Sequence, residues 1–129
     1  MSDKIKVIIA DDNKSLCGFI EKYLKQYEDI EVLGIANTDE EELRIIEELK
    51  PDIVITDLMR NHKYTGLDII KHYFNKKDSP QFLVISAECK QDVIRDEIEV
   101  AGYIEKGWKF DYENILKELR RIKGKWKNN

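Results

Sequence analysis

The sequence has few of the features that mark membrane, secreted or disulfide-linked proteins. No apolar run approaches the ~18 residues of a membrane-spanning helix, and residues 1–4 do not resemble a signal peptide. The two cysteines, Cys17 and Cys89, lack the spacing of a metal site or a disulfide framework, so we expect reduced thiols. Together these absences predict a cytoplasmic protein without a membrane partner.

The sequence also lacks an excess of positive charge, internal repeats and low-complexity tracts. It holds 22 Lys and Arg against 26 Asp and Glu, a net charge of −4. This balance argues against direct binding of nucleic acid by the domain. A chain of 129 residues suits one domain that buries about two thirds of its unfolded surface. We assign residues 1–123 to that domain and residues 124–129 to a basic tail or linker stub.

Apolar runs and helical stripes alternate along the chain. Short β-branched runs predict five strands, near residues 5–10, 30–36, 53–57, 82–85 and 102–105. Helical periodicity predicts five helices, which begin after residue 13 and near residues 39, 66, 90 and 111. The segment from Thr38 to Glu41 fits a capping box at one of these helix starts. The alternation predicts an α/β fold, with a parallel sheet and helices on both faces.

Each predicted helix should turn one apolar stripe toward the sheet. The stripe of the first helix is expected to be Leu16, Phe19, Ile20, Tyr23 and Leu24. The stripe of the second is expected to be Leu43, Ile46 and Leu49. The third should use Leu67, Ile70, Tyr73 and Phe74, and the last Ile115, Leu116, Leu119 and Ile122. A weaker helix is expected from about Lys90 to Glu97, with Val93 and Ile94 as its apolar residues.

Charged and polar side chains stand where the predicted strands end. Asp11 and Asp12 follow the first strand and Asp57 ends the third. Ser86 ends the fourth strand and Lys106 follows the fifth. In open parallel sheets the carboxyl ends of the strands meet at one edge, where ligands bind. Each residue alone has an ordinary explanation, because Asp often caps a helix and a lone Lys usually faces solvent. Their joint occurrence at the strand ends favours a functional site.

Three carboxylates at one edge require a positive partner. At ~4 Å and an effective dielectric constant of ~20, each pair of like charges costs about 4 kcal/mol. A hard cation such as Mg²⁺ meets that need, because it binds through one or two carboxylates and water. Lys106 supplies a second positive charge and Ser86 a hydroxyl group. This set suits phosphoryl transfer in which Asp57 is the nucleophile and becomes an aspartyl phosphate.

This set of residues resembles the motifs of response-regulator receiver domains, and the resemblance covers nearly the whole chain. The matching motifs are Asp11-Asp12, Asp57, Ser86-Ala87 and Lys106. The resemblance implies a doubly wound (βα)5, flavodoxin-like fold like that of the chemotaxis regulator, with strand order 2-1-3-4-5. A narrower resemblance, to the receiver half of sporulation transcription-factor regulators, rests on residues 4–7, 10–13 and 110–114.

The resemblance also implies a role for each site residue. Asp57 would accept the phosphoryl group, which Ser86 and Lys106 would then contact. Tyr103 falls where the family has its switch aromatic. The implied ligands of Mg²⁺ are Asp12 directly, Asp11 largely through water, Asp57, and the backbone carbonyl of Met59.

The same resemblance implies partners for the domain. A histidine kinase or phosphotransfer protein would donate the phosphoryl group. The face formed by the helix near residues 90–97, the strand near 102–105 and the last helix would control an output domain or a separate partner. A homodimer through that face is a further implication.

The sequence departs from the family pattern after Asp57, after Lys106, and in the stretch from Ser86 to Lys106, which is slightly short and suggests an irregular fourth helix. Arg60, Asn61 and His62 occupy the stretch where the family usually has a Met-Pro pair, and Gly66 lies about one residue further along. The loop after Asp57 is therefore expected to be lengthened. Gly107 follows Lys106 in place of a proline that commonly has a cis peptide bond. Without proline a cis bond costs about 2.5–4 kcal/mol, so a trans bond is expected.

Two other functions remain open on the sequence alone. Haloacid-dehalogenase-like phosphatases also use an Asp nucleophile, but they place a second Asp two residues later, where this chain has Met59. We therefore expect no turnover of an outside substrate. The second alternative is a degenerate receiver, an interaction module that ignores phosphate. The complete set of site residues argues against that alternative, and the altered loop after Asp57 argues for it.

Overall fold

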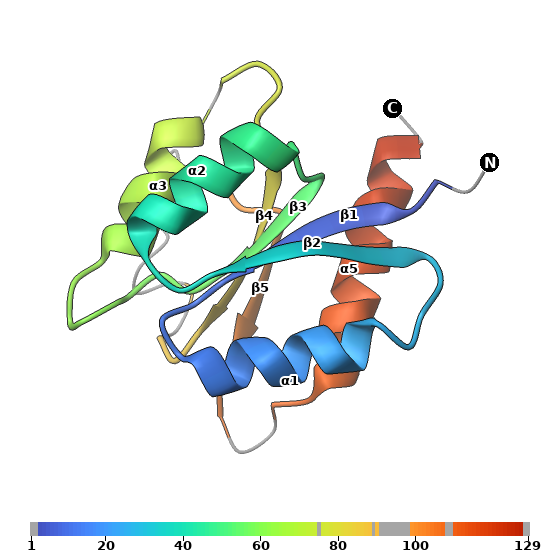
Figure 1. Ribbon diagram of the computed structural model, residues 1–129, viewed down its shortest axis with the longest axis horizontal. Coiled ribbons are helices and arrows are strands. Elements are labelled where there is room, and N and C mark those ends of the chain that lie inside the picture. Colours follow the sequence, from blue (N-terminus) through green and yellow to red (C-terminus); the bar gives the residue numbers. More distant parts are fainter. Residues whose placement is uncertain (1–2, 75, 89, 91–98, 108–109, 128–129) are drawn as a thin grey trace.

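A parallel sheet of five strands forms the centre of the molecule (Figure 1). A computed structural model describes residues 3–74, 76–88, 90, 99–107 and 110–127. The strands are β1 (Ile5–Ala10), β2 (Ile30–Ala36), β3 (Ile53–Thr56), β4 (Gln81–Ser86) and β5 (Gly102–Glu105). Their order in the sheet is β2-β1-β3-β4-β5, with every pair parallel. The predicted flavodoxin-like strand order is therefore confirmed.

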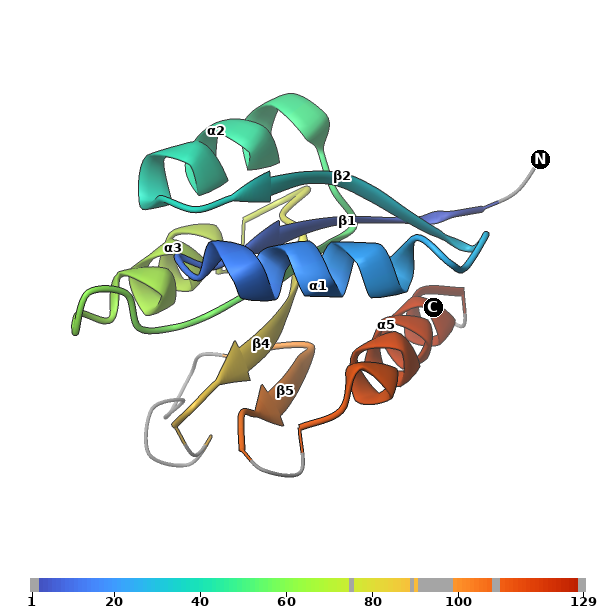
Figure 2. The same cartoon turned by 60° about the horizontal axis from the view of Figure 1, so that its bottom comes forward.

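Helices cover both faces of the sheet (Figure 2). They are α1 (Lys14–Leu24), α2 (Asp39–Leu49), α3 (Thr65–Tyr73) and α5 (Tyr112–Lys127). Among the described helices, none is long and apolar enough to cross a membrane. The helix expected from about Lys90 to Glu97 lies, beyond Lys90, outside the described residues.

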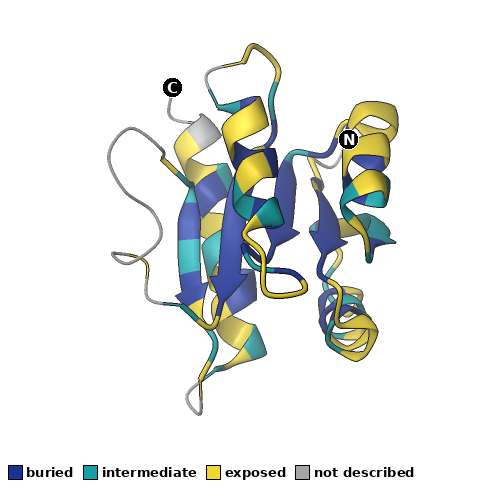
Figure 3. Ribbon diagram, turned by 90° about the vertical axis from the view of Figure 1, so that its left-hand side faces the viewer, coloured by how far each residue is buried: buried dark blue, intermediate teal, exposed yellow. Residues whose placement is uncertain are grey.

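The sheet divides the core into two apolar layers. Along β1, Val7 and Ile9 point to the layer that α1 and α5 cover, whereas Ile8 and Ala10 point to the layer that α2 and α3 cover. This alternation follows from the two-residue period of a strand. The central strand β3 is buried on both faces, as its β-branched run predicts. Figure 3 shows the same division, with buried residues along the strands and exposed residues on the outer sides of the helices.

Two of the predicted helix stripes were partly wrong. In α1 the buried residues are Cys17, Ile20 and Leu24, and Phe19 is 60% exposed. In α2 the inward stripe is Glu42, Ile45 and Ile46, while Leu43 and Leu49 are more than one third exposed. The α2 stripe is rotated because a charged residue, Glu42, occupies an inward position. The predicted stripe of α5 is confirmed, since Ile115, Leu116, Leu119 and Ile122 are all buried.

Side-chain caps set the starts of α1 and α2. Asn13 Oδ1 accepts a hydrogen bond from the Leu16 N–H at 3.0 Å. Thr38 Oγ1 accepts one from the Glu41 N–H at 3.1 Å, as the capping box predicts. The return bond differs from the prediction, because Glu41 Oε1 accepts from the N–H of Asn37 at 3.1 Å. Each of these helices therefore begins within a few residues of the end of the preceding strand, α1 after β1 and α2 after β2.

The edge strand β2 pairs irregularly with β1. Val7 lies opposite Val32, but the next residue of β1, Ile8, lies opposite Gly34. Leu33 is therefore an extra residue in β2, which makes this a β-bulge.

Candidate functional site at the carboxyl edge of the sheet

Two carboxylates and one ammonium group meet where three strands end. Asp11 follows β1, Asp57 follows β3 and Lys106 follows β5. Lys106 Nζ donates to Asp57 Oδ2 at 2.9 Å and to Asp11 Oδ2 at 3.2 Å. Both carboxylates are largely buried, whereas 27% of the Lys106 side chain is exposed. The structure thus brings these three predicted residues together, and we call them the acidic cluster.

Backbone amides fix the orientation of both carboxylates. Asp57 Oδ1 accepts a hydrogen bond from the Leu58 N–H at 2.7 Å and a longer one from the Met59 N–H at 3.5 Å. Asp11 Oδ1 accepts one from the Asn13 N–H at 2.9 Å. In each carboxylate one oxygen is held by the backbone and the other faces Lys106. A single cation therefore contacts two anions through charge-assisted hydrogen bonds and offsets one of their two negative charges.

The charge of Lys106 is stabilised by its two partners. Burial disfavours the charged form, but the carboxylates of Asp57 and Asp11 outweigh burial and raise the pKa of Lys106 above its ordinary value. The lysine backbone is fixed as well, since its N–H donates to the Ser86 carbonyl at 2.7 Å. No peptide bond in the described ranges is cis, in agreement with the trans bond expected before Gly107.

Ser86 and Tyr103 both form hydrogen bonds with the backbone of Glu88. Ser86 is buried at the end of β4, and its Oγ accepts a hydrogen bond from the Glu88 N–H at 3.2 Å. Tyr103 is half-buried on β5, and its hydroxyl donates to the Glu88 carbonyl at 2.8 Å. Burial raises the pKa of the Tyr103 hydroxyl, and a hydrogen bond with the Ser86 side chain opposes that shift. The predicted hydroxyl and the predicted switch aromatic therefore belong to one hydrogen-bonded unit.

Gly66 permits the chain to pass close to Asp57. A Cβ atom at this position would lie 2.0 Å from the Asp57 carbonyl oxygen and 3.0 Å from Leu58 Cα. The Gly66 N–H donates to the Leu58 carbonyl at 3.0 Å. The start of α3 is thereby held against the residues that follow β3.

The remaining predicted metal ligands flank the acidic cluster. Asp12 is exposed and follows Asp11, and Met59 is half-buried two residues after Asp57. In the part of the chain that the structure describes, no group of three His, Cys, Asp or Glu side chains is arranged to hold a metal ion. The donors at this edge are carboxylate and carbonyl oxygens, and Lys106 shows that one cation reaches both Asp11 and Asp57. These residues fit Mg²⁺, which keeps several waters, better than a metal that needs a full set of protein ligands.

Arg60 is the residue that sequence reasoning missed. It stands out in the sequence only as a departure from the Met-Pro pair, but in the fold it is buried beside the phosphoacceptor candidate. Its Nη1 lies 2.6 Å from Asp39 Oδ1 and 2.7 Å from Glu42 Oε1. Its Nη2 donates to Thr56 Oγ1 at 2.6 Å and to the Asp57 carbonyl at 3.2 Å. No local sequence signal indicates this role, because the burial of its partner Glu42 in α2 is visible only in the fold.

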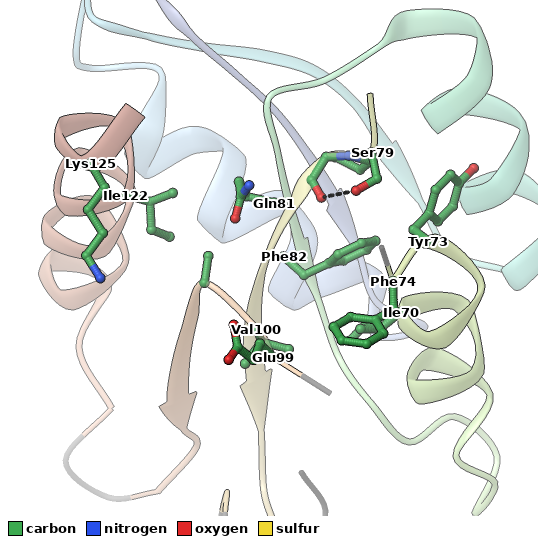
Figure 4. A pocket seen from close by; sticks show the side chains of 12 residues that line it. Ile70, Tyr73, Phe74, Ser79, Gln81, Phe82, Glu99, Val100, Ile122 and Lys125 are labelled. Carbon is green, nitrogen blue, oxygen red and sulfur yellow. Dashed lines mark hydrogen bonds between the residues drawn. The ribbon is translucent and has the colours of Figure 1, made fainter. Parts of the chain in front are cut away.

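A pocket of about 390 Å³ lies at the opposite end of β4, where that strand begins (Figure 4). Apolar side chains such as Ile70 and Phe82 line it, and Glu99 and Lys125 are its charged residues. It contains none of the strand-end carboxylates. The strand-end residues that the sequence suggests as a site therefore lie at the carboxyl edge of the sheet and not in this pocket.

Comparison with known proteins shows that most of the chain forms one family domain. The family model of the response regulator receiver domain matches residues 7–120. The signal receiver domain of the response regulator NarL from Mycobacterium tuberculosis is 21% identical, with a TM-score of 0.80 over 95% of this chain and 98% of that one. A receiver domain from Bermanella marisrubri is 25% identical, with a TM-score of 0.77 over 92% and 98%.

A longer protein is similar over part of its length. RcsB from Salmonella enterica serovar Typhimurium, solved bound to the promoter rprA, is 24% identical with a TM-score of 0.75. The match covers 94% of this chain and 61% of that one. The chain therefore spans about three fifths of RcsB.

Proposed function

We propose, from the premise that this chain belongs to the response regulator receiver domain family, that Asp57 accepts a phosphoryl group from a histidine kinase or phosphotransfer protein. The observation that carries the proposal is the pair of contacts from Lys106 Nζ to Asp57 Oδ2 and Asp11 Oδ2. It supports a nucleophilic carboxylate that already lies beside a cation able to neutralise incoming phosphoryl oxygens.

The side chains of the acidic cluster have different roles in the phosphoryl transfer. A carboxylate oxygen of Asp57 forms the new bond to phosphorus, and the leaving group departs with the electron pair of the bond that breaks. The Leu58 N–H holds the other oxygen of Asp57, so the side chain keeps its orientation during attack. Lys106, which is partly exposed, exchanges a carboxylate contact for a contact with a phosphoryl oxygen.

A divalent cation is part of this proposal. Asp11, Asp12, Asp57 and the Met59 carbonyl would hold Mg²⁺, in keeping with the hard oxygen donors at this edge. When bound, the metal supplies electrostatic stabilisation of the charge on the transferred group.

The output would pass through the unit of Ser86, Glu88 and Tyr103. A phosphoryl group on Asp57 offers the Ser86 hydroxyl a stronger acceptor than any neutral group. Movement of Ser86 removes its contact with the Glu88 N–H, and the Glu88 carbonyl is the acceptor for Tyr103. Phosphorylation would thus shift the population of two arrangements at the β5 and α5 face.

That face would control an output domain in a longer chain, a separate partner, or a homodimer. The promoter-bound RcsB supports the first of these, because that longer chain contains a matching receiver region. We place the protein in the cytoplasm and expect no turnover of an outside substrate. The altered loop after Asp57 favours one alternative, a receiver that acts as an interaction module without phosphate.

Intact-mass measurement tests the proposal. The protein is incubated with acetyl phosphate in the presence of Mg²⁺ and again in the presence of EDTA, with Asp57→Asn as the control. We expect a gain of one phosphoryl group that requires Mg²⁺ and disappears in the variant. A folded wild-type protein that gains no mass under any condition would support the interaction module instead.

A further inference from the structure

Arg60 lies at the centre of a second charged cluster. We call Arg60, Asp39, Glu42 and Thr56 the Arg60 cluster. The Arg60 side chain is 6% exposed and that of Glu42 is fully buried. Arg60 Nη1 faces the two carboxylates of α2, at 2.6 Å and 2.7 Å. The first turn of α2 and the loop after β3 lie at the same end of the sheet (Figure 2).

The other end of the guanidinium group reaches the backbone beside the acidic cluster. Arg60 Nη2 donates to the Asp57 carbonyl at 3.2 Å and, at 3.5 Å, to the Ala10 carbonyl. The Ala10 carbonyl also accepts from the Asp57 N–H at 3.2 Å. One side chain therefore connects α2 to the ends of β1 and β3, at the residues that precede or carry the two carboxylates.

The main chain of Arg60 is fixed as well. Its N–H donates to the Lys63 carbonyl at 2.7 Å, and the Lys63 N–H donates to the Arg60 carbonyl at 3.0 Å. The two residues between them, Asn61 and His62, have positive φ values of 50° and 62°. Positive φ at both central residues is the pattern of a type I′ hairpin turn. The lengthened loop thus closes as a tight turn that starts at Arg60.

We infer that Arg60 is a positioning residue, which holds the backbone from Asp57 to Arg60 so that the Asp57 carboxylate and the Met59 carbonyl face the same cation. Met59 lies between two fixed points, because the Asp57 carbonyl and Arg60 are joined by a hydrogen bond. The identity of that cation as Mg²⁺ rests on the proposed function. The conformation of the loop is independent of the proposed function, because it follows from the hydrogen bonds described above.

Arginine suits this task for a geometric reason. Its planar guanidinium group presents several donors in fixed directions, so one residue serves α2 and both strand ends at once. The family usually has a proline near this position, and a proline ring restricts the backbone directly. Here a buried side chain supplies the restraint.

A simpler explanation is that Arg60 only neutralises Glu42. A buried carboxylate is costly, and burial raises the pKa of Glu42. Two variants separate the explanations. Arg60→Met leaves Glu42 without its cation, whereas Arg60→Met combined with Glu42→Met removes both charges and fills the space with apolar atoms. Replacing a buried ion pair in this way commonly restores stability.

The experiment compares these variants with wild type by thermal unfolding, by amide hydrogen exchange and by calorimetric titration of the unphosphorylated protein with Mg²⁺. We expect Arg60→Met to unfold at a lower temperature and the double variant to regain most of the loss. In both variants the amides of Leu58, Lys63 and Gly66 should exchange at least about tenfold faster, the size expected for losing one hydrogen bond to a charged donor. Mg²⁺ should bind about tenfold more weakly.

Two further variants sharpen the test. Arg60→Lys keeps the positive charge but loses the planar guanidinium group with its several donors. The variant should therefore keep much of the stability and still show fast amide hydrogen exchange in the loop. Arg120→Met removes an exposed guanidinium group whose partner is Asp29, and it should change neither the loop amides nor the Mg²⁺ titration.

A double variant with native exchange at Leu58, Lys63 and Gly66 would overturn the inference and leave Arg60 as a counter-ion of Glu42. This outcome is distinct from failure of the proposed function. If wild type fails to gain a phosphoryl group or to bind Mg²⁺, the proposed function falls, and the exchange rates still decide whether Arg60 fixes the loop.

Discussion

The acidic cluster and the Arg60 cluster contain the same kinds of charged group, but their cations differ in exposure to solvent. Lys106 in the acidic cluster is 27% exposed, whereas Arg60 is 6% exposed and Glu42 fully buried. A partly solvated ammonium group changes partners at little cost. A buried ion pair that loses one member leaves an uncompensated charge, which is strongly destabilising. The difference explains why chemistry is expected at one cluster and fixed structure at the other.

The largest expected effect comes from removing the cation of the acidic cluster. Lys106→Met keeps the aliphatic stem and removes the charge beside Asp57. Loss of one group that stabilises a developing charge typically costs about 10²-fold or more in rate. The rate of Mg²⁺-dependent phosphorylation by acetyl phosphate should fall by that amount, as measured by intact mass over time. Lys117→Met, which removes an exposed lysine paired with Glu113, serves as the control. A rate equal to that of wild type would contradict the role of Lys106.

Substitution of two glutamates of α2 compares the contribution of a buried ion pair to stability with that of an exposed one. Glu42 pairs with the buried Arg60, and Glu48 pairs with the exposed Arg44. Glu42→Gln should lower the free energy of unfolding by about 3 kcal/mol, the low end for breaking a buried pair, because Asp39 still faces Arg60. Glu48→Gln should lower it by about 0.5 kcal/mol or less. Denaturant titrations measure both, and equal effects would show that burial does not distinguish the clusters.

Two glycines test how tightly the chain packs beside Asp57. Gly66→Ala places a Cβ 2.0 Å from the Asp57 carbonyl, so the backbone must move. We expect a loss of about 1–3 kcal/mol of stability, as for other overpacked sites, and slower phosphorylation. Gly18→Ala is the matched control, because a Cβ there has no neighbour within 4 Å and Gly18 is exposed in α1. That change should stabilise the protein by about 0.5–1 kcal/mol. A neutral Gly66→Ala would contradict the close approach.

Charged groups of both clusters affect the pKa of the Cys17 thiol. Burial, followed by the charge of Asp11, raises the pKa of its thiol from 9.0 to about 11, while Lys106 and Arg60 oppose the shift. In the unfolded chain the thiol ionises near pH 9, so its contribution to stability should decline as the pH rises from about 9 to about 11. The decline is at most roughly 2–3 kcal/mol.

Urea unfolding between pH 8 and pH 11 measures that decline, with Cys17→Ser as the control. The variant should lose less stability than wild type over the same interval. In a Cys89→Ser background, iodoacetamide should react with Cys17 at pH 8.5 only after unfolding. Rapid reaction of the native protein would refute the raised pKa.

The sequence was sufficient to predict the strands of the sheet and the polar residues that gather at its carboxyl edge. Short runs rich in β-branched residues mark the strands, so β1 and β2 begin and end at the predicted residues. The convergence of Asp11, Asp57 and Lys106 followed from parallel topology, because such strands end at one edge. The structure shows that these three residues meet, and the roles of all the site residues stay predictions, those of Asp12, Met59, Ser86 and Tyr103 included.

Periodicity failed where a charged residue points inward. The stripe predicted for α2 assumed that Glu42 faces solvent, and its burial depends on Arg60, which is 18 residues away in the chain. No local pattern records such a pair. The prediction for Phe19 failed in the opposite way. This large apolar residue of α1 was expected to be buried, but it is exposed, and the smaller Cys17 packs inward.

The bulge in β2 has a consequence for self-assembly. β2 forms one edge of the sheet, where unpaired backbone groups can add a strand from another molecule. Leu33 interrupts the regular spacing of those groups, and the exposed Glu31 places a charge beside them. Both features disfavour the addition of a strand from a second copy of the chain along β2.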